Sequence, residues 1–196
     1  MTSNVAGVLL AAGSGSRLGR PKALVVVGGQ TLVARGVALL QDGGAHPVIV
    51  VTGAAELADP PGPDVVSVRN PDWATGMGSS LATGLGAVPP DRAAAVIALA
   101  DQPLVGAESV RRLVAAFESG AGVVVACYEG LPRNPVLISR KHWPAVVALA
   151  TGDVGARPFL RAHPDLVTRV ECGDVGRPDD IDSPEDLARA ERMLAT

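Results

Sequence analysis

The chain has 196 residues, of which 47% are hydrophobic and 19% charged, a balance that predicts a packed globular domain and excludes a disordered segment. A net charge of −3 and an aromatic content of only 3% exclude a broad basic or stacking surface, so we expect no nucleic-acid partner. The two cysteines, Cys127 and Cys172, lie far apart in the sequence, and we expect free thiols in a reducing cytoplasm. The apolar runs have only the length of strands and no signal-like segment is recognisable, so we expect a soluble, cytoplasmic protein without a membrane partner.

The predicted elements alternate between strands and helices. Buried or short strands are expected over residues 5–10, 47–52, 65–68, 94–100, 122–127, 136–138 and 166–170. Helices are expected from residue 31 to the glycine pair at 43–44, and over residues 81–87, 108–117, 144–149, 156–163 and 183–194. Residues 58–64 and 130–135 are expected to be loops because they are rich in proline, glycine and polar residues.

This alternation is typical of an α/β fold in which helices cover both faces of a mostly parallel sheet. The Val-, Leu- and Ala-rich core that the composition implies suits such a sheet. Because no repeat, linker or charge block divides the chain, we expect residues 1–196 to form a single domain.

A glycine-rich loop follows the first predicted strand. It comprises Leu10, Ala11, Ala12, Gly13, Ser14 and Gly15, with Arg17 and Lys22 shortly after. Successive backbone amides in such a loop form a concave anion site, and the two cations add positive charge beside it. An ordinary strand-to-helix turn with surface charges is the alternative, but two cations so close to the glycines favour a polyphosphate cradle.

Two aspartates stand where a metal ion could join that cradle. Asp101 comes directly after the strand expected over 94–100, and Asp182 precedes the terminal helix. Ligands of open α/β sheets bind at the carboxyl ends of the strands, and Mg²⁺ is held by one or two carboxylates plus substrate phosphates. Asp101 alone could equally serve a turn or a helix N-cap, and support of the helix start is a strong alternative for Asp182 alone. Together they predict a Mg²⁺ site facing the loop.

A third polar segment spans residues 70–80 and is dense in small side chains. Its backbone amides and its Thr75, Ser79 and Ser80 hydroxyls could hydrogen-bond a nucleobase or a second substrate, and its glycine-rich end suits a phosphate at a helix start. A loop that simply concentrates turn-forming residues is the alternative.

Other chemistries find less support in the sequence. The three histidines have no zinc-ligand spacing, and neither a nucleophile elbow nor a Walker A motif is present. Gly13-Ser14-Gly15 begins like a dinucleotide motif, but Leu18 stands where its third glycine belongs, which disfavours an NAD enzyme.

The motifs as a set resemble those of the MobA-like nucleotidyltransferases, and within them the molybdenum cofactor cytidylyltransferases. The stretch from Leu10 to Lys22 resembles the general nucleotidyltransferase signature. Five later motifs are similar to those of the subgroup: Asn70-Pro with Gly76, Ser79 and Ser80; Ala100-Asp101-Gln102-Pro103; Asn134-Pro135-Val136; Gly152-Asp153 with Gly155, Ala156 and Arg157; and Asp180-Ile181-Asp182 with Ser183 to Asp186.

The resemblance implies a Rossmann-like, glycosyltransferase-A type fold and a Mg²⁺-dependent reaction. The terminal phosphate of molybdopterin, or of its molybdenum form, would attack the α-phosphate of a nucleoside triphosphate and release pyrophosphate. Arg17, Lys22 and Asp101 would be catalytic, with Asp101 and Asp182 as metal ligands. Nucleotide contacts are expected from residues 10–15 and from Asn70, Gly76, Ser79 and Ser80, and acceptor contacts from the 130–135 and 152–157 loops.

The same resemblance bears on the substrates and leaves alternatives open. The form Ala11-Ala12-Gly13 favours CTP over GTP, and a molybdoenzyme or its chaperone would receive the product. Relatives often carry Arg-Gly-His/Asn-Pro where this chain has Pro132-Arg133-Asn134-Pro135. This departure leaves more than one acceptor open. A sugar phosphate as acceptor, GTP as donor, and a non-catalytic protein that delivers molybdenum cofactor are the alternatives.

Overall fold

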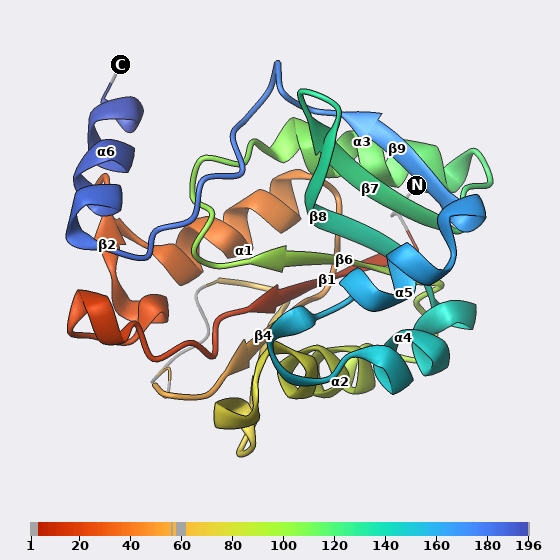
Figure 1. Ribbon diagram of the computed structural model, residues 1–196, viewed down its shortest axis with the longest axis horizontal. Helices are drawn as coiled ribbons and strands as arrows, with labels where there is room; N and C mark the ends of the chain where they lie inside the picture. The colour runs from red at the N-terminus through yellow and green to blue at the C-terminus, as the bar shows by residue number, and fades with distance from the viewer. Residues whose placement is uncertain (1–3, 56, 58–61, 196) are drawn as a thin grey trace.

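A seven-stranded sheet forms the centre of the computed structural model, which describes residues 4–55, 57 and 62–195 (Figure 1). The strands follow the order β5-β4-β1-β6-β8-β7-β9. Their bounds are β1 Val5–Leu10, β4 Val48–Thr52, β5 Val65–Arg69, β6 Ala94–Leu99, β7 Val123–Tyr128, β8 Leu131–Ser139 and β9 Val167–Glu171. Most of the loop expected over 58–64 lies outside the described residues, which resume at residue 62.

Parallel pairing dominates the sheet, as the sequence predicts. β1 pairs in parallel with β4 and β6, β4 with β5, and β7 with β9. β8 runs antiparallel to both of its neighbours, β6 and β7. The carboxyl ends of β1 and β6 therefore lie side by side, and this arrangement places the glycine-rich loop next to Asp101.

Helices cover both faces of the sheet, which confirms the expected layers (Figure 1). Helices α1 (Leu32–Asp42) and α3 (Ala107–Glu118) pack on one face, and α2 (Met77–Ala87), α4 (Trp143–Leu149) and α5 (Arg157–Ala162) on the other. Helix α6 (Pro184–Leu194) packs against a small ribbon formed by β2 (Val26–Val27) and β3 (Gln30–Thr31).

The alternation of side chains along β1 divides the core into two clusters. Leu9 faces α1 and α3, whereas Val8 faces α2 and α5, and all six residues of β1 are buried. Burying one such aliphatic side chain contributes roughly 1.5–3 kcal/mol. Because both faces of β1 are fixed by packing, the loop at its carboxyl end starts from a rigid strand.

Two sequence predictions about element bounds are corrected. Residues 130–135 are not a loop, because β8 starts at Leu131 and forms a tight hairpin with β7 around Glu129 and Gly130. The pairing register shifts between Val125 and Ala126, and such an irregularity lets a strand tolerate prolines that donate no ladder hydrogen bond. Helix α2 begins at Met77, four residues before the predicted start, so the glycine-serine run belongs to its first turn.

Across the described ranges, no helix is both long enough and apolar enough to span a bilayer. The described cysteines, Cys127 and Cys172, are free and buried, as expected.

Candidate active site

The glycine-rich loop after β1 closes on itself and forms a cradle. Gly15 and Gly19 adopt left-handed φ values of 60° and 69°, and the Lys22 amide donates to the Gly13 carbonyl at 3.2 Å. A Cβ on Gly15 would lie 2.1 Å from the Arg20 carbonyl oxygen, so this turn requires glycine. The side chains of Leu10, Ala11 and Ala12 are buried, which leaves their backbone groups as the part that a ligand could contact.

Two cations from this loop meet two aspartates from distant parts of the chain. The Lys22 Nζ lies 2.6 Å from Asp101 Oδ2 and 2.5 Å from Asp182 Oδ1. The Arg17 Nη2 lies 3.4 Å from Asp182 Oδ2. We call Arg17, Lys22, Asp101 and Asp182 the charge cluster. The structure thus brings together the four side chains that the sequence selects for catalysis and metal binding.

Backbone contacts hold the two aspartates in place. The Ile181 amide donates to the Asp101 carbonyl at 2.8 Å, and the Ile181 side chain is buried beneath the segment. Directly after Asp182, Ser183 caps α6 and forms a capping box with Asp186. The position of the Asp182 carboxylate is therefore set by the start of a helix.

The two aspartates of the cluster favour the charged form of Lys22. Burial acts to lower the pKa of Lys22, but Asp101 and Asp182 outweigh it and raise this pKa, so the ammonium stays protonated. Asp180 lies beside the cluster and accepts a hydrogen bond from Gln102 Nε2 at 2.8 Å. Burial, and then the negative charges of Asp101 and Asp182, raise the pKa of Asp180.

The donor set of the cluster fits a hard divalent cation. One ammonium already reaches an oxygen of both Asp101 and Asp182, which shows that a single cation can contact both carboxylates. Among the described residues, no group of three or more His, Cys, Asp or Glu side chains could hold a metal ion. An ion at these two carboxylates would share its remaining ligands with phosphate oxygens and water, as Mg²⁺ commonly does.

The hydroxyls and amide of the 70–80 segment bond mainly within the segment. The Asn70 side chain is buried and donates from Nδ2 to Ser79 Oγ at 2.9 Å and to Ser80 Oγ at 3.0 Å. Thr75 donates to the Asp72 carbonyl at 2.8 Å. These bonds hold the turn against the first turn of α2. A role of Asn70, Ser79 and Ser80 in nucleotide binding stays a prediction, and it would act through the shape of this turn.

The 70–80 segment also packs tightly on the loop that precedes α5. Gly76 has a φ of 119°, and a Cβ there would lie 2.3 Å from the Gly152 carbonyl carbon. A Cβ on Gly78 would lie 2.2 Å from the Ala150 carbonyl oxygen. Two motifs that are far apart in the sequence are thus one packed unit, in which the glycines permit a backbone-to-backbone contact.

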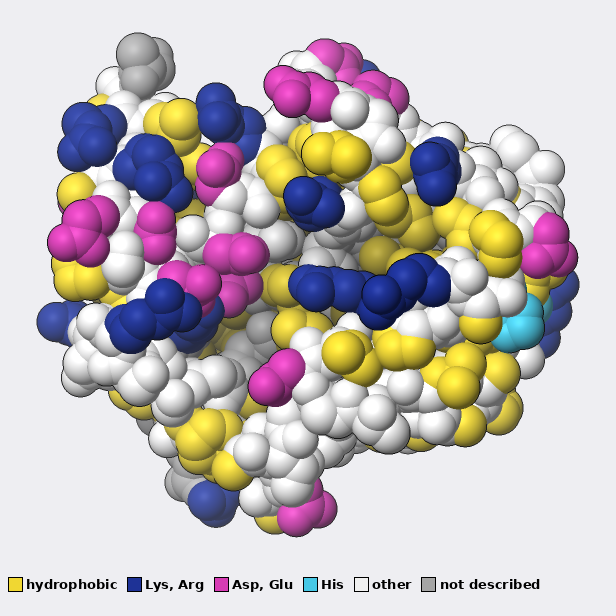
Figure 2. Space-filling view, viewed as in Figure 1, with side chains coloured by type: hydrophobic (Ala, Val, Ile, Leu, Met, Phe, Trp, Pro, Cys, Tyr) yellow, Lys and Arg dark blue, Asp and Glu magenta, His cyan; other side chains and the backbone are white. Residues whose placement is uncertain are grey.

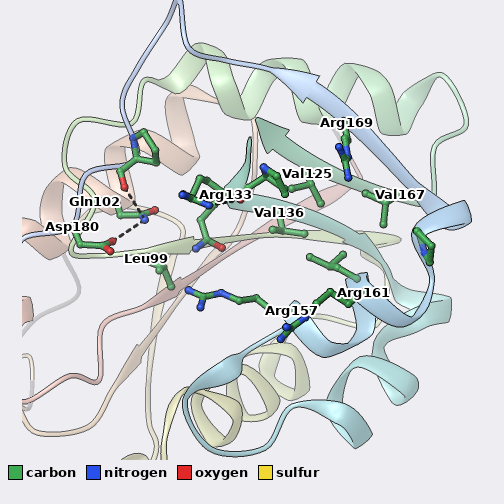
Figure 3. A pocket seen from close by; sticks show the side chains of 15 residues that line it. Leu99, Gln102, Val125, Arg133, Val136, Arg157, Arg161, Val167, Arg169 and Asp180 are labelled. Atoms are coloured by element: carbon green, nitrogen blue, oxygen red, sulfur yellow. Dashed lines mark hydrogen bonds between the residues drawn. The ribbon is translucent and has the colours of Figure 1, made fainter. Parts of the chain in front are cut away.

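A cavity of about 820 Å³ opens beside the charge cluster. Gln102 and Asp180 line the end nearest the cluster, and aliphatic side chains of β6, β7, β8 and α5 line its interior. Figure 3 shows Arg133 and Arg169 approaching this space from the strands and Arg157 and Arg161 from α5. Figure 2 shows basic side chains crossing the hollow on this face, with acidic side chains gathered to one side of it.

Only part of this cavity is predictable from the sequence. The 130–135 and 152–157 segments, which the resemblance places near the acceptor, supply Arg133, Asn134 and Arg157. Arg161 and Arg169 are not predicted from the sequence, in which Gln102 belongs only to a motif. A signal for Arg161 exists, because it lies four residues after Arg157 on one helix and hence on the same helical face.

Comparison with known proteins relates most of the chain to one family. The family described as the MobA-like NTP transferase domain matches residues 7–167. A protein of Paenarthrobacter nicotinovorans named nicotine blue oxidoreductase is 39% identical, over 94% of this chain and 95% of its own. A molybdenum cofactor guanylyltransferase of Rhizobium johnstonii is 31% identical, over 98% of this chain and 94% of its own.

Solved structures show the same architecture. A homologue of Mycobacterium tuberculosis Rv0371c, from Mycobacterium sp. strain JC1, has a TM-score of 0.80 at 31% identity and covers 98% of this chain and 100% of its own. Rv0371c of Mycobacterium tuberculosis H37Rv in complex with manganese has a TM-score of 0.74 at 25% identity, with coverage of 98% and 100%. By its sequence and its fold, the chain belongs to the MobA-like NTP transferase family.

Proposed function

We propose that this protein transfers a nucleotidyl group from a nucleoside triphosphate to molybdopterin or its molybdenum form and releases pyrophosphate. The observation that carries this proposal is the position of the charge cluster between the glycine-rich loop and the arginine-lined cavity. A triphosphate in the loop and a phosphorylated acceptor in the cavity would meet at the cluster. Such a reaction depends on positioning and charge neutralisation more than on proton transfer.

Within the cluster, the cations would bind the triphosphate and the aspartates would bind its metal ion. The loop amides and the Arg17 and Lys22 side chains would bind phosphate oxygens and offset the negative charge that develops during transfer. Asp101 and Asp182 would hold a divalent cation, for which we propose Mg²⁺. That ion, when bound, supplies charge neutralisation and orients the phosphates.

The cavity suits an anionic acceptor with an extended organic body. Its four arginines can pair with phosphate or other anionic groups, and its aliphatic interior can cover an apolar surface. The relative named molybdenum cofactor guanylyltransferase supports molybdopterin or molybdenum cofactor as this acceptor. We further propose that the product passes in the cytoplasm to a molybdoenzyme or its chaperone.

We favour CTP as the nucleotide. The loop has the form Ala11-Ala12-Gly13, without two adjacent glycines, and this form resembles the cytidylyl members more than the guanylyl ones. Two of the matching relatives are named guanylyltransferases, so GTP is the natural competitor in the test.

A second candidate function is reduction of an organic substrate. The relative named nicotine blue oxidoreductase favours it, because its 39% identity extends over 94% of this chain. The departure of the loop from the dinucleotide motif argues against a nicotinamide cofactor in the position usual for such enzymes.

One set of incubations separates these functions. The purified chain is mixed with Mg²⁺ and each nucleoside triphosphate in turn, with molybdopterin, its molybdenum form, a sugar phosphate or no acceptor, and pyrophosphate is measured. We expect release with CTP and only when molybdopterin or its molybdenum form is present. Release with GTP alone would contradict the cytidylyl assignment, and release with the sugar phosphate alone would contradict the acceptor. No release with any acceptor would favour a delivery protein, and oxidation of a reduced nicotinamide cofactor in a parallel assay would favour the reductase.

A further inference from the structure

Lys22 makes the closest contacts of the charge cluster. Its ammonium donates to Asp101 Oδ2 at 2.6 Å and to Asp182 Oδ1 at 2.5 Å, and only 18% of its side chain is exposed. Asp101 is similarly sheltered at 20%. Arg17, in contrast, is 71% exposed and lies 3.4 Å from the second oxygen of Asp182. The ammonium of Lys22 therefore lies where a cation shared by the two carboxylates would lie.

We propose that Lys22 competes with the divalent ion for Asp101 and Asp182, so that the ion and the triphosphate bind cooperatively. This inference rests on the proposed function, because it assigns the ion to these carboxylates and the triphosphate to the loop. Two cations cannot occupy one position between the same oxygens without strong repulsion. An ion that contacts both carboxylates must therefore displace the ammonium.

The path of the Lys22 side chain gives the displaced ammonium a second partner. A Cβ on Gly13 would lie 3.6 Å from Lys22 Cδ and 3.9 Å from Lys22 Cγ, so the aliphatic stem passes over the glycine-rich loop. A short rotation about the flexible stem would move the ammonium from the aspartates to a phosphate held by that loop. Contacts between the ammonium and the triphosphate would thus replace the contacts with Asp101 and Asp182 that Lys22 loses to the ion.

The consequence is a positive coupling between the two ligands. Without a triphosphate, the ion must displace a paired ammonium, and the loop over residues 10–22 has no acidic side chain of its own to pair with it. With a triphosphate bound, Lys22 has phosphate oxygens as partners and the carboxylates are available. By linkage, each ligand raises the affinity of the other by the same factor.

The test measures Mn²⁺ binding by electron paramagnetic resonance of the free ion, without acceptor and without turnover. Lys22→Met keeps an aliphatic stem and removes the ammonium, and it should bind Mn²⁺ at least about tenfold more tightly than the unmodified chain when no nucleotide is present. A non-hydrolysable CTP analogue should tighten Mn²⁺ binding in the unmodified chain and do so much less in the variant. Lys22→Gln provides a second variant if Lys22→Met does not fold, as judged by circular dichroism.

Arg20→Met is the matched control, because Arg20 is an exposed cation of the same loop. It should leave Mn²⁺ affinity near the unmodified value, since an exposed charge is screened. The inference is overturned if Lys22→Met binds Mn²⁺ no more tightly than the unmodified chain, while Asp101→Asn still loses the binding seen with the analogue. If Asp101→Asn has no effect even with the analogue, the metal site of the proposed function fails, and this inference fails with it.

Discussion

The charge cluster and the arginine-lined cavity are adjacent, but charges are paired in the cluster and, among the described residues, the arginines of the cavity are not paired with carboxylates. In the cluster, Lys22 is paired with two aspartates at 2.5–2.6 Å. Lys22 and Asp101 follow the neighbouring strands β1 and β6, and the start of α6 positions Asp182. In the cavity, none of the four arginines (Arg133, Arg157, Arg161 and Arg169) forms an ion pair within the described part of the chain. These arginines come from the antiparallel hairpin, from α5 and from β9.

This difference indicates what each region can do. In the cluster, two cations already neutralise two carboxylates, so an incoming divalent ion would add positive charge that a triphosphate would offset, which suits a site that takes the two ligands together. Arginines without carboxylate partners leave a positive field, which attracts and orients an anionic ligand. The first region would carry the chemistry, and the second would select the acceptor.

The strongest test of the first region is Asp101→Ala. It removes one of the two carboxylates that reach Lys22, and we expect turnover to fall about 10³-fold or more because the metal and phosphate positions are both disturbed. Steady-state pyrophosphate release measures the loss, and circular dichroism checks the fold. Glu118→Ala, at the exposed end of α3, is the control and should keep full activity. Unchanged turnover in Asp101→Ala would refute the role of this carboxylate.

Gly76→Ala tests the contact between the 70–80 segment and the loop that precedes α5. The added Cβ would meet the Gly152 backbone at 2.3 Å, and the φ of 119° is strained for alanine. We expect the free energy of unfolding to fall by about 2–3 kcal/mol, measured by urea denaturation. Gly86→Ala, in helix α2, is the matched control, because a Cβ there would meet nothing within 4 Å beyond its chain neighbours and the nearby backbone of the helix itself. Equal stability of the two variants would contradict the packing described.

Much of this arrangement follows from the sequence, and the remainder depends on tertiary contacts. Apolar runs ending at Gly13 and Asp101 identify two strand ends, and a parallel sheet must bring such ends to one edge. The bridging position of Lys22 could not be predicted, because its contacts span 79 and 160 residues of sequence and depend on how the side chain crosses the loop. The prolines of the 130–135 segment indicate a loop by composition, whereas a shift in pairing register makes room for them in a strand.

The cavity shows the same limit of sequence reasoning. Its arginines come from three separate elements and share no motif, so only the folded chain gathers them. In the sequence, Arg133 departs from the pattern that relatives often carry. The structure places it in the wall of the cavity, where a displaced arginine can still reach a ligand.

Arg157→Ala tests the arginine-lined cavity separately from the charge cluster. Loss of one charge-assisted hydrogen bond costs about 1.5–3 kcal/mol, so we expect the KM for the acceptor to rise at least about tenfold. The KM for the nucleotide should stay near its original value, since Arg157 lines the cavity and not the charge cluster. Arg111→Ala, an exposed arginine on α3, is the control. A rise in the nucleotide KM alone would show that the two regions are not divided as described.

The smallest expected effect comes from Ser183→Ala. Ser183 accepts a hydrogen bond from the Asp186 amide and caps α6 directly after Asp182. Removal of such a cap costs about 1 kcal/mol, which thermal unfolding can detect. We also expect a modest fall in turnover, because Asp182 depends on this helix start for its position. A variant with full stability and full turnover would show that the cap does not support the cluster.

The most direct test of the central claim is the mass of the acceptor after reaction. The unmodified chain is incubated with Mg²⁺, CTP and molybdopterin, and the acceptor is analysed by mass spectrometry alongside the released pyrophosphate. We expect the acceptor to gain one cytidine monophosphate unit and one pyrophosphate to appear for each molecule converted. An acceptor of unchanged mass, with no pyrophosphate released, would contradict the assignment of this protein as a nucleotidyltransferase acting on that acceptor.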